Sequence, residues 1–122
     1  MWDVTDGKLN AIVTCRSNDV PLGMPFNITQ YAVLLHLIAH VTGLKPGKLY
    51  YNVKDVHIYV NQIDGIKEQI KRYHELGDFP APKLWINENV KDFFEFDNSK
   101  ELKDIKLIDY QHHGKISMPV AV

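Results

Sequence analysis

Two clusters of polar side chains have the chemistry to hold a small anionic ligand. In the first cluster, Arg16 offers a planar fork of donors to phosphate oxygens, and Ser17 adds a hydroxyl donor. Asp19 follows two residues later and can accept a hydrogen bond from a ring N–H. The same segment also fits a polar turn at the end of a strand, which needs no ligand.

The second cluster lies on an alternating segment, in which neighbouring side chains point to opposite faces of a strand. Its polar side chains share one face: Asp55, His57, Tyr59 and Asn61. Its apolar side chains share the other: Val56, Ile58 and Val60. We expect the apolar face to pack on the core, and the polar face either to meet water or to line a cavity. A histidine beside a tyrosine can donate paired hydrogen bonds to a sugar hydroxyl.

Two further residues and one histidine pair have two interpretations each. Asn27 can cap a helix, or its amide can read the O4/N3 edge of a uracil ring. Cys15 has a cation beside it in Arg16, but it shares an apolar strand face, which indicates a buried and inert thiol. The pair His112 and His113 lacks carboxylate or cysteine partners at ligand spacing, so a polar turn explains it better than a metal site.

Bulk composition excludes several classes of protein. The chain has 122 residues, and 14 Lys plus Arg nearly balance 15 Asp plus Glu, which argues against nucleic-acid binding by general electrostatics. The most apolar run, from Ile28 to Val41, is shorter than the roughly 20 residues that cross a bilayer. One cysteine and no signal-peptide pattern lead us to expect a soluble, cytoplasmic protein without membrane or metal partners.

The elements that must position these residues follow from turn signals and periodicity. Asp6-Gly7 predicts a hairpin, followed by a strand with an apolar face through Leu9, Ala11, Val13 and Cys15. A rigid loop is expected from Ser17 to Phe26. A helix is expected over Ile28–Thr42, with Asn27 as its N-cap and Gly43 after its end.

The second half of the chain predicts a strand over Leu49–Asn61 and an amphipathic helix that ends at Gly77. Short strands are expected at Lys83–Ile86, Ile105–Tyr110 and Lys115–Val120, with a helical turn near Val90–Phe94. The fold class is therefore mixed α/β, with a central helix that is apolar almost all round. Such a helix needs covering on every side, so we expect a partner subunit or a missing segment to complete its burial.

Three motifs together resemble the thymidylate synthase family. They are the loop from Arg16 to Ile28 (Arg-Ser-Asn-Asp-Val-Pro-Leu-Gly-Met-Pro-Phe-Asn-Ile), the segment Asp55-Val-His-Ile-Tyr-Val-Asn61, and the tail Met118-Pro-Val-Ala-Val122. They occur in the family's order. The resemblance implies that residues 1–122 are the C-terminal part of one thymidylate synthase domain.

The resemblance implies reductive methylation of dUMP to dTMP, with 5,10-methylenetetrahydrofolate as co-substrate and a homodimer as the assembly. It implies seven dUMP contacts: Arg16, Ser17, Asn18, Asp19, Asn27, His57 and Tyr59. The first two would bind the phosphate, Asn27 the uracil edge, and the last two the ribose 3′-hydroxyl. It implies six folate contacts: Asp19, Leu22, Gly23, Phe26, Ala121 and Val122. Asp19 and Asn27 are the implied catalytic residues, and the tail would close over the folate and exclude water.

Departures from the family pattern limit what this chain can do alone. The nucleophile of the family lies in a Pro-Cys-His segment upstream of the phosphate arginine, and the chain contains no such segment. The upstream arginines and glutamate of the family are also missing, Lys54 stands where a glycine is usual, and Gln62 replaces a usual histidine. We therefore expect the isolated chain to be inactive. The alternatives are a non-catalytic nucleotide-binding or association remnant and, disfavoured by Asn27, a dCMP hydroxymethylase.

Overall fold

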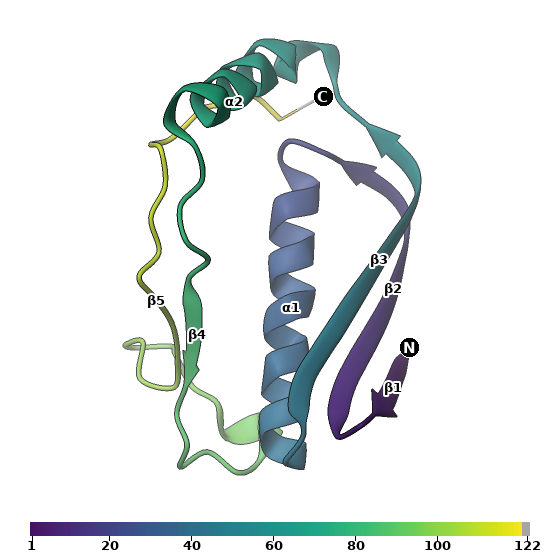
Figure 1. Cartoon of the computed structure of the whole chain (residues 1–122), viewed down its shortest axis with the longest axis vertical. Helices are drawn as coiled ribbons and strands as arrows, with labels where there is room; N and C mark the ends of the chain where they lie inside the picture. The colour runs from purple at the N-terminus through teal and green to yellow at the C-terminus, as the bar shows by residue number, and fades with distance from the viewer. Residues whose placement is uncertain (121–122) are drawn as a thin grey trace.

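The computed structural model describes residues 1–120 and consists of a sheet, a long helix against one of its faces, and a C-terminal region beyond that helix (Figure 1). The three-stranded sheet has the order β1 (Trp2–Thr5), β2 (Lys8–Asp19), β3 (Lys45–His57). Strands β1 and β2 are antiparallel and joined at Asp6-Gly7, as predicted. Strands β2 and β3 are parallel, and α1 (Gly23–Thr42) connects them, which gives a βαβ unit.

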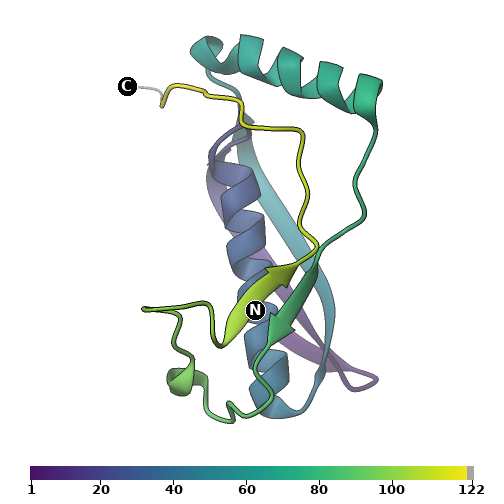
Figure 2. The ribbon, with the colours of Figure 1, turned by 90° about the vertical axis from the view of Figure 1, so that its left-hand side faces the viewer.

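The rest of the chain packs around the other side of α1. A short 3₁₀ turn (Val60–Gln62) leads into α2 (Ile63–Leu76), which lies across the end of the βαβ unit. Strands β4 (Lys83–Ile86) and β5 (Ile105–Ile108) then form a two-stranded antiparallel sheet, so α1 lies between the two sheets (Figure 2). A second 3₁₀ turn (Phe93–Glu95) lies in the connection from β4 to β5.

A β-bulge on β3, opposite Asn10 near the start of β2, sets the register of the parallel pair. Leu9 is paired with Pro46, but Ala11 is paired with Leu49, so the pairing shifts by one residue at Asn10. At the bulge, the side chain of Asn10 takes the place of a backbone acceptor, because its Oδ1 accepts a 2.8 Å hydrogen bond from the backbone N–H of Lys48. That oxygen lies where a Cβ of Gly47 would be, so only glycine fits at position 47.

The core is small and lies between the sheet and α1. Its buried members are Leu9, Ala11, Leu35 and Ala39, and the half-buried side chains of Ile38, Leu44 and Leu49 pack against it. Helix α1 ends as predicted, because Gly43 adopts a left-handed conformation (φ 70°). However, Phe26 is 74% exposed. The described residues therefore cover only part of this apolar helix.

Several predicted boundaries were wrong. The expected loop from Ser17 to Phe26 is mostly regular structure, because β2 continues its ladder with β3 to Asp19 and α1 begins at Gly23. Pro25 is tolerated in the first turn of α1, where a backbone N–H has no intrahelical partner. Asn27 is therefore inside the helix and is not its N-cap, which is Leu22.

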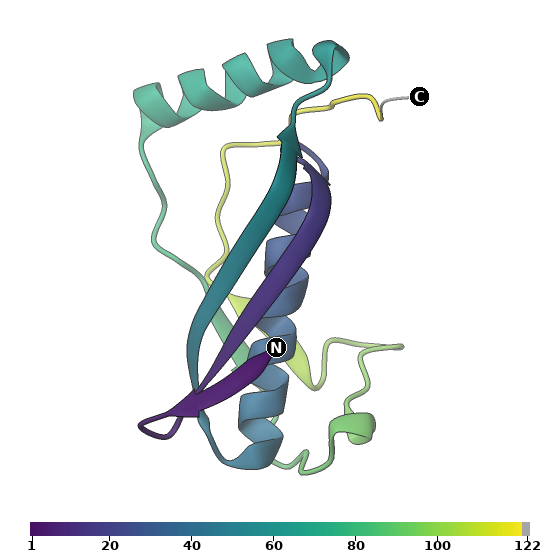
Figure 3. The same ribbon diagram turned by 90° about the vertical axis from the view of Figure 1, so that its right-hand side faces the viewer.

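The long strand expected over Leu49–Asn61 is displaced towards the N-terminus. It begins at Lys45, whose backbone N–H bonds to the carbonyl of Gly7 beside the hairpin, and it ends at His57. The expected apolar face does not pack on the core, since Val56, Ile58 and Val60 are 57%, 45% and 85% exposed. Figure 3 shows this face of the sheet, which no described helix covers.

The C-terminal expectations were met only in part. Strand β5 ends at Ile108 rather than Tyr110, and the turn expected near Val90–Phe94 is found at Phe93–Glu95. The third expected strand, Lys115–Val120, is absent among residues 1–120, because this segment leaves β5 and runs to α2 instead of pairing with a neighbour (Figure 1).

Candidate functional site

The polar clusters of β2 and β3 meet at the carboxyl ends of these two parallel strands. In the ladder, Ser17 lies opposite Asp55 and Asp19 lies opposite His57. The Ser17 hydroxyl donates a 3.2 Å hydrogen bond to Oδ2 of Asp55. Nδ1 of His57 lies 3.8 Å from the same oxygen, which is an ion-pair distance for a protonated histidine. The structure therefore brings together the two clusters that the sequence offered separately.

His57 and Tyr59 form an aromatic pair at the end of β3. Their ring centroids are 4.9 Å apart and the ring planes make an angle of 78°, an edge-to-face arrangement. Tyr59 is 43% exposed, so its hydroxyl group remains accessible. Nδ1 of His57 is buried and has no hydrogen-bond partner within residues 1–120. Within this pair, Tyr59 is therefore the more accessible side chain for a ligand hydroxyl.

Asn27 is connected to the sheet through Asn18. The Asn18 side-chain nitrogen donates a 2.9 Å hydrogen bond to Oδ1 of Asn27, and the Tyr51 hydroxyl donates a 2.9 Å hydrogen bond to Oδ1 of Asn18. Asn18 is only 6% exposed. Burial, together with the neighbouring Cys15 thiol, raises the pKa of Tyr51, so this hydroxyl stays a donor. Asn18 thus lies behind Asn27, where it fixes the orientation of the Asn27 amide.

Gly23 permits this arrangement at the start of α1. A Cβ atom at this position would lie 3.0 Å from the Asn18 side-chain nitrogen and 3.6 Å from Oδ1 of Asn27. The absence of a side chain therefore lets the first turn of α1 approach the end of β2 closely. In the sequence analysis, Gly23 was only an implied folate contact.

Asp19 uses both carboxylate oxygens. Oδ1 accepts from the backbone N–H of Leu22 at 3.2 Å, which holds the turn between β2 and α1. Oδ2 accepts from the side-chain nitrogen of Gln62 at 3.3 Å. Gln62 is completely buried. Sequence reasoning noted it only as a departure from a motif, because a single glutamine carries no signal of such contacts.

The remaining residues of the first cluster differ in exposure. Cys15 is half-buried, and its thiol donates to the backbone carbonyl oxygen of Ser17 at 3.1 Å, as a structural cysteine does. Arg16 is exposed, and within residues 1–120 it has no carboxylate within ion-pair distance. Its guanidinium is therefore available to an anion.

A cleft of about 870 Å³ lies beside this polar group. Leu22 and Phe26 line one side, and Tyr73, Phe79 and Pro82 are among the residues of the other side. Asn18, Asn27 and His57 do not line it. Apolar and aromatic walls of this kind suit a flat ring system.

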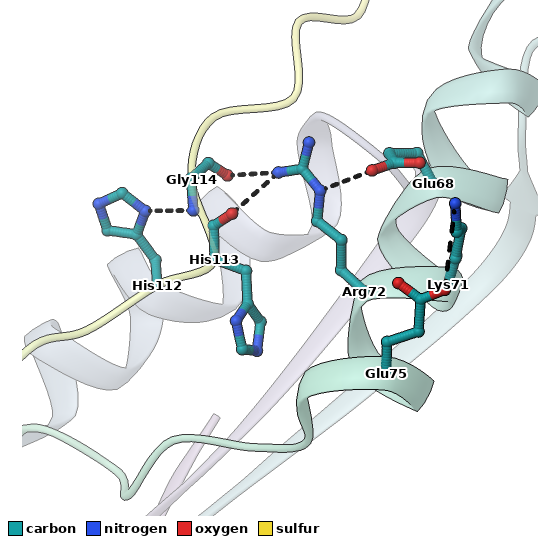
Figure 4. Close-up of polar contacts among 7 residues, drawn as sticks. All are labelled: Glu68, Lys71, Arg72, Glu75, His112, His113 and Gly114. Carbon is teal, nitrogen blue, oxygen red and sulfur yellow. Dashed lines mark hydrogen bonds and ion pairs between the residues drawn. The ribbon is translucent and has the colours of Figure 1, made fainter.

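Arg72 on α2 fixes one wall of the cleft (Figure 4). Its Nε donates a 2.8 Å hydrogen bond to Glu68, and its Nη1 donates to the backbone carbonyl oxygens of His113 and Gly114 at 3.0 and 3.1 Å. His112 accepts from the backbone N–H of Gly114, and His113 bonds to the carbonyl of Gly77 at 2.7 Å. His113 thus joins its segment to the end of α2, whereas His112 stabilises its own turn.

Neither a metal cluster nor a membrane-spanning helix is found in the described part of the chain. In residues 1–120, no three or more His, Cys, Asp or Glu side chains gather closely enough to hold a metal ion. None of the helices in this part of the chain is both long and apolar enough to span a bilayer. Ala121 and Val122, the two expected folate contacts at the C-terminus, lie outside the described residues.

Comparison with known proteins gives one consistent result. A family model described as thymidylate synthase matches residues 1–122. The thymidylate synthase of Clostridium beijerinckii is 52% identical over 122 residues, which are 100% of this chain and 44% of that protein. Thymidylate synthase 1 of Bacillus subtilis is 46% identical over 121 residues, which are 99% of this chain and 40% of that protein.

A solved structure agrees with the sequence comparisons. Thermostable thymidylate synthase A from Bacillus subtilis superposes with a TM-score of 0.88 at 46% sequence identity. The superposition covers 99% of this chain and 41% of that chain. The chain therefore spans less than half of the length of the relatives that it matches.

Proposed function

Because the chain belongs to the thymidylate synthase family, we propose that it is the C-terminal part of a domain that converts dUMP to dTMP with 5,10-methylenetetrahydrofolate. The observation that carries this proposal is the meeting of Ser17, Asp55 and His57 across β2 and β3, with Asn27 held nearby through Asn18. The phosphate, sugar and base of a nucleotide lie at fixed distances from one another. The protein residues that bind them must therefore come from several segments that surround one volume.

For the nucleotide, we assign the phosphate to Arg16 and Ser17. Arg16 is exposed and provides a charged fork, and Ser17 is held on the same strand end. His57 and Tyr59 are assigned to the ribose 3′-hydroxyl, in keeping with their edge-to-face contact. Asn18 is kept in the nucleotide site as the residue that orients Asn27.

For the base, we assign recognition to Asn27. Its Oδ1 already accepts one hydrogen bond from Asn18, which leaves the amide N–H₂ group free to donate to O4 of uracil. The fixed amide still has a second lone pair on Oδ1 for the N3–H group of the base. Asp19, beside it, would contact the pterin and order water near the base.

For the folate, we assign Leu22 and Phe26, which line the 870 Å³ cleft, together with Gly23 and Asp19, which are close to them in the sequence but do not line it. The aromatic walls fit the flat aryl part of a folate. When bound, the folate supplies the one-carbon unit and the hydride. The residues of this chain bind and orient it, and the tail excludes water.

Two apolar surfaces that the described residues leave exposed suggest which polypeptides this chain binds. A groove of about 570 Å³ runs between α1 and β4, lined by apolar residues such as Ile28, Ala32 and Val33. Since the chain spans 44% and 40% of its two named relatives, we assign this groove to the remainder of the family domain. The open sheet face, with Val56 exposed, is assigned to a homodimer contact. Such an enzyme works in the cytoplasm.

The test is to mix the chain with a separate polypeptide that carries the rest of a family domain, including its Pro-Cys-His segment. With dUMP and methylenetetrahydrofolate present, we expect dTMP and dihydrofolate to form. The change in absorbance measures the formation of dihydrofolate. Arg16→Ala should abolish the recovered activity, whereas Lys48→Ala, at the other end of β3, should not.

Two outcomes favour the alternatives. Binding of the two polypeptides without turnover, with nucleotide bound, points to a non-catalytic remnant. Turnover of dCMP in preference to dUMP points to a hydroxymethylase, against the donor pattern of Asn27.

A further inference from the structure

Gln62 connects the nucleotide end of the sheet with the C-terminal segment. It is 0% exposed and lies in the 3₁₀ turn between β3 and α2. Its side-chain nitrogen donates to Oδ2 of Asp19 at 3.3 Å and to the backbone carbonyl oxygen of Pro119 at 3.2 Å. These acceptors are 100 residues apart in the sequence. One amide group therefore holds both the carboxylate of the site and the tail.

A second contact seats the same tail segment. A Cβ atom on Gly65, in the first turn of α2, would lie 2.6, 2.8 and 2.9 Å from Cγ, Cε and Sδ of Met118. The Met118 side chain therefore occupies the space that the missing Gly65 side chain leaves. Met118 and Pro119 are thus held by Gly65 of α2 and by Gln62 of the preceding turn, three residues apart.

Packing alone does not account for a glutamine here. Its Oε1 is buried and has no hydrogen-bond partner within residues 1–120, which costs stability relative to an apolar side chain of similar size. What the amide provides is a pair of donors aimed at two segments that no other described side chain joins in this way.

We propose that Gln62 is a positioning residue that couples the seating of the tail, Met118–Val120, to the carboxylate of Asp19. The two acceptors share one rigid amide, so a rotation of the Gln62 side chain that follows the departing tail withdraws the donor from Asp19. The contacts that carry this coupling lie within this chain and involve no ligand. Its effect on folate binding rests on the proposed function, because Asp19 is there assigned to the pterin.

The coupling can be tested without any ligand by NMR of the 122-residue chain with ¹³C-labelled methionine methyl groups. The chain has three methionines, so Met1, Met24 and Met118 give three assignable signals. In Gln62→Leu, we expect the Met118 methyl signal to move to its random-coil position and to narrow, with Met24 unchanged. Gln30→Leu, on the exposed side of α1, is the matched control and should leave all three signals in place.

A second variant perturbs the tail instead of Gln62, so the proposal can still be tested if Gln62→Leu does not fold. Gly65→Ala adds a good helix former to α2 but displaces Met118. We expect the buried Gln62 side-chain N–H₂ signals to shift and to exchange faster with solvent in this variant. Unchanged Gln62 signals in a folded Gly65→Ala chain, or an unchanged Met118 signal in Gln62→Leu, would overturn the coupling. Neither result depends on nucleotide or folate, so failure of the proposed function remains a separate outcome.

Discussion

The side-chain nitrogen of Asn18 donates a 2.9 Å hydrogen bond to Oδ1 of Asn27, and Asn18 itself is only 6% exposed. Behind it, the Tyr51 hydroxyl completes a chain of three polar groups from β3 through β2 to α1. The orientation of the Asn27 amide is therefore decided by a tyrosine on the second strand of the parallel pair. Each link of this chain can be removed separately.

Tyr51→Phe should lower the free energy of unfolding by about 1–3 kcal/mol, because Asn18 is left with an unpartnered buried oxygen. The ring contact with Tyr31 is kept in this variant. Urea denaturation followed by circular dichroism measures the change. Tyr50→Phe is the matched control, since Tyr50 is 48% exposed and should give a change near zero. Equal losses in both variants would contradict the buried network.

A polypeptide of these 122 residues alone should form no dTMP. The reason is chemical, because no thiolate is available to attack the base once Cys15 is half-buried and bonded to the carbonyl of Ser17. The absorbance assay with dUMP and methylenetetrahydrofolate should remain at background. Turnover that survives purification and disappears in Cys15→Ser would overturn this expectation.

The isolated chain should associate in solution. The open face of the sheet exposes Tyr50 and Val56, and Ile58 and Val60 follow them directly. Sedimentation equilibrium at micromolar concentration should show a dimer or larger species. Val56→Lys should shift the distribution towards monomer, while Leu76→Lys, equally apolar and 63% exposed at the end of α2, should not. A clean monomer for the unmodified chain would remove the basis of the homodimer assignment.

Acid should destabilise the segment between β4 and β5 through Asp104. The side-chain hydrogen bond from Asn87, and then the backbone N–H of Asp97, hold the pKa of Asp104 below its ordinary value. The charged form is thus favoured in the folded state, so stability is present above about pH 4 and is lost as pH falls through the lowered pKa.

Asp104→Asn tests this directly. The variant should be less stable than the unmodified chain at pH 7 and should lose less stability between pH 5 and pH 3. Urea denaturation across that range measures both effects. Asp78→Asn, at an exposed position, is the control and should follow the unmodified chain at every pH. An unchanged acid slope in Asp104→Asn would assign the effect to other carboxylates.

The features that could be predicted from the sequence are those that one or two residues determine. Asp6 and Gly7 both adopt positive φ (50° and 70°), as a tight hairpin requires, and Gly43 and Gly77 end their helices. The clusters at Arg16–Asp19 and Asp55–Tyr59 can be marked in the sequence, because side-chain chemistry is visible without a structure, while their roles in binding stay predictions. These signals depend only on the local backbone.

The features that could not be predicted depend on partners far away in the chain. The bounds of β3 follow from its ladder with β2, and nothing in Lys45-Pro46-Gly47 indicates a strand by itself. Val56 was expected inside because its sequence alternates, but the covering helix lies on the other face of the sheet. Gln62 became part of the site only through contacts with Asp19 and Pro119.

The bulge of β3 opposite Asn10 also decides which residues of β2 and β3 lie opposite each other along the rest of the parallel pair, because Gly47 and Lys48 together oppose the single residue Asn10. If the same chain continued the register of Leu9 and Pro46 without a bulge, every later pairing would slip by one, and Ser17 and Asp19 would lie opposite Lys54 and Val56 instead of Asp55 and His57. The side chain of Asn10, which stabilises the bulge, therefore helps to decide which residues meet at the far ends of both strands, although it contacts none of them. An insertion of one residue in β2 between Ala11 and Ser17 should therefore move Ser17 and Asp19 away from Asp55 and His57 while leaving all four residues unchanged.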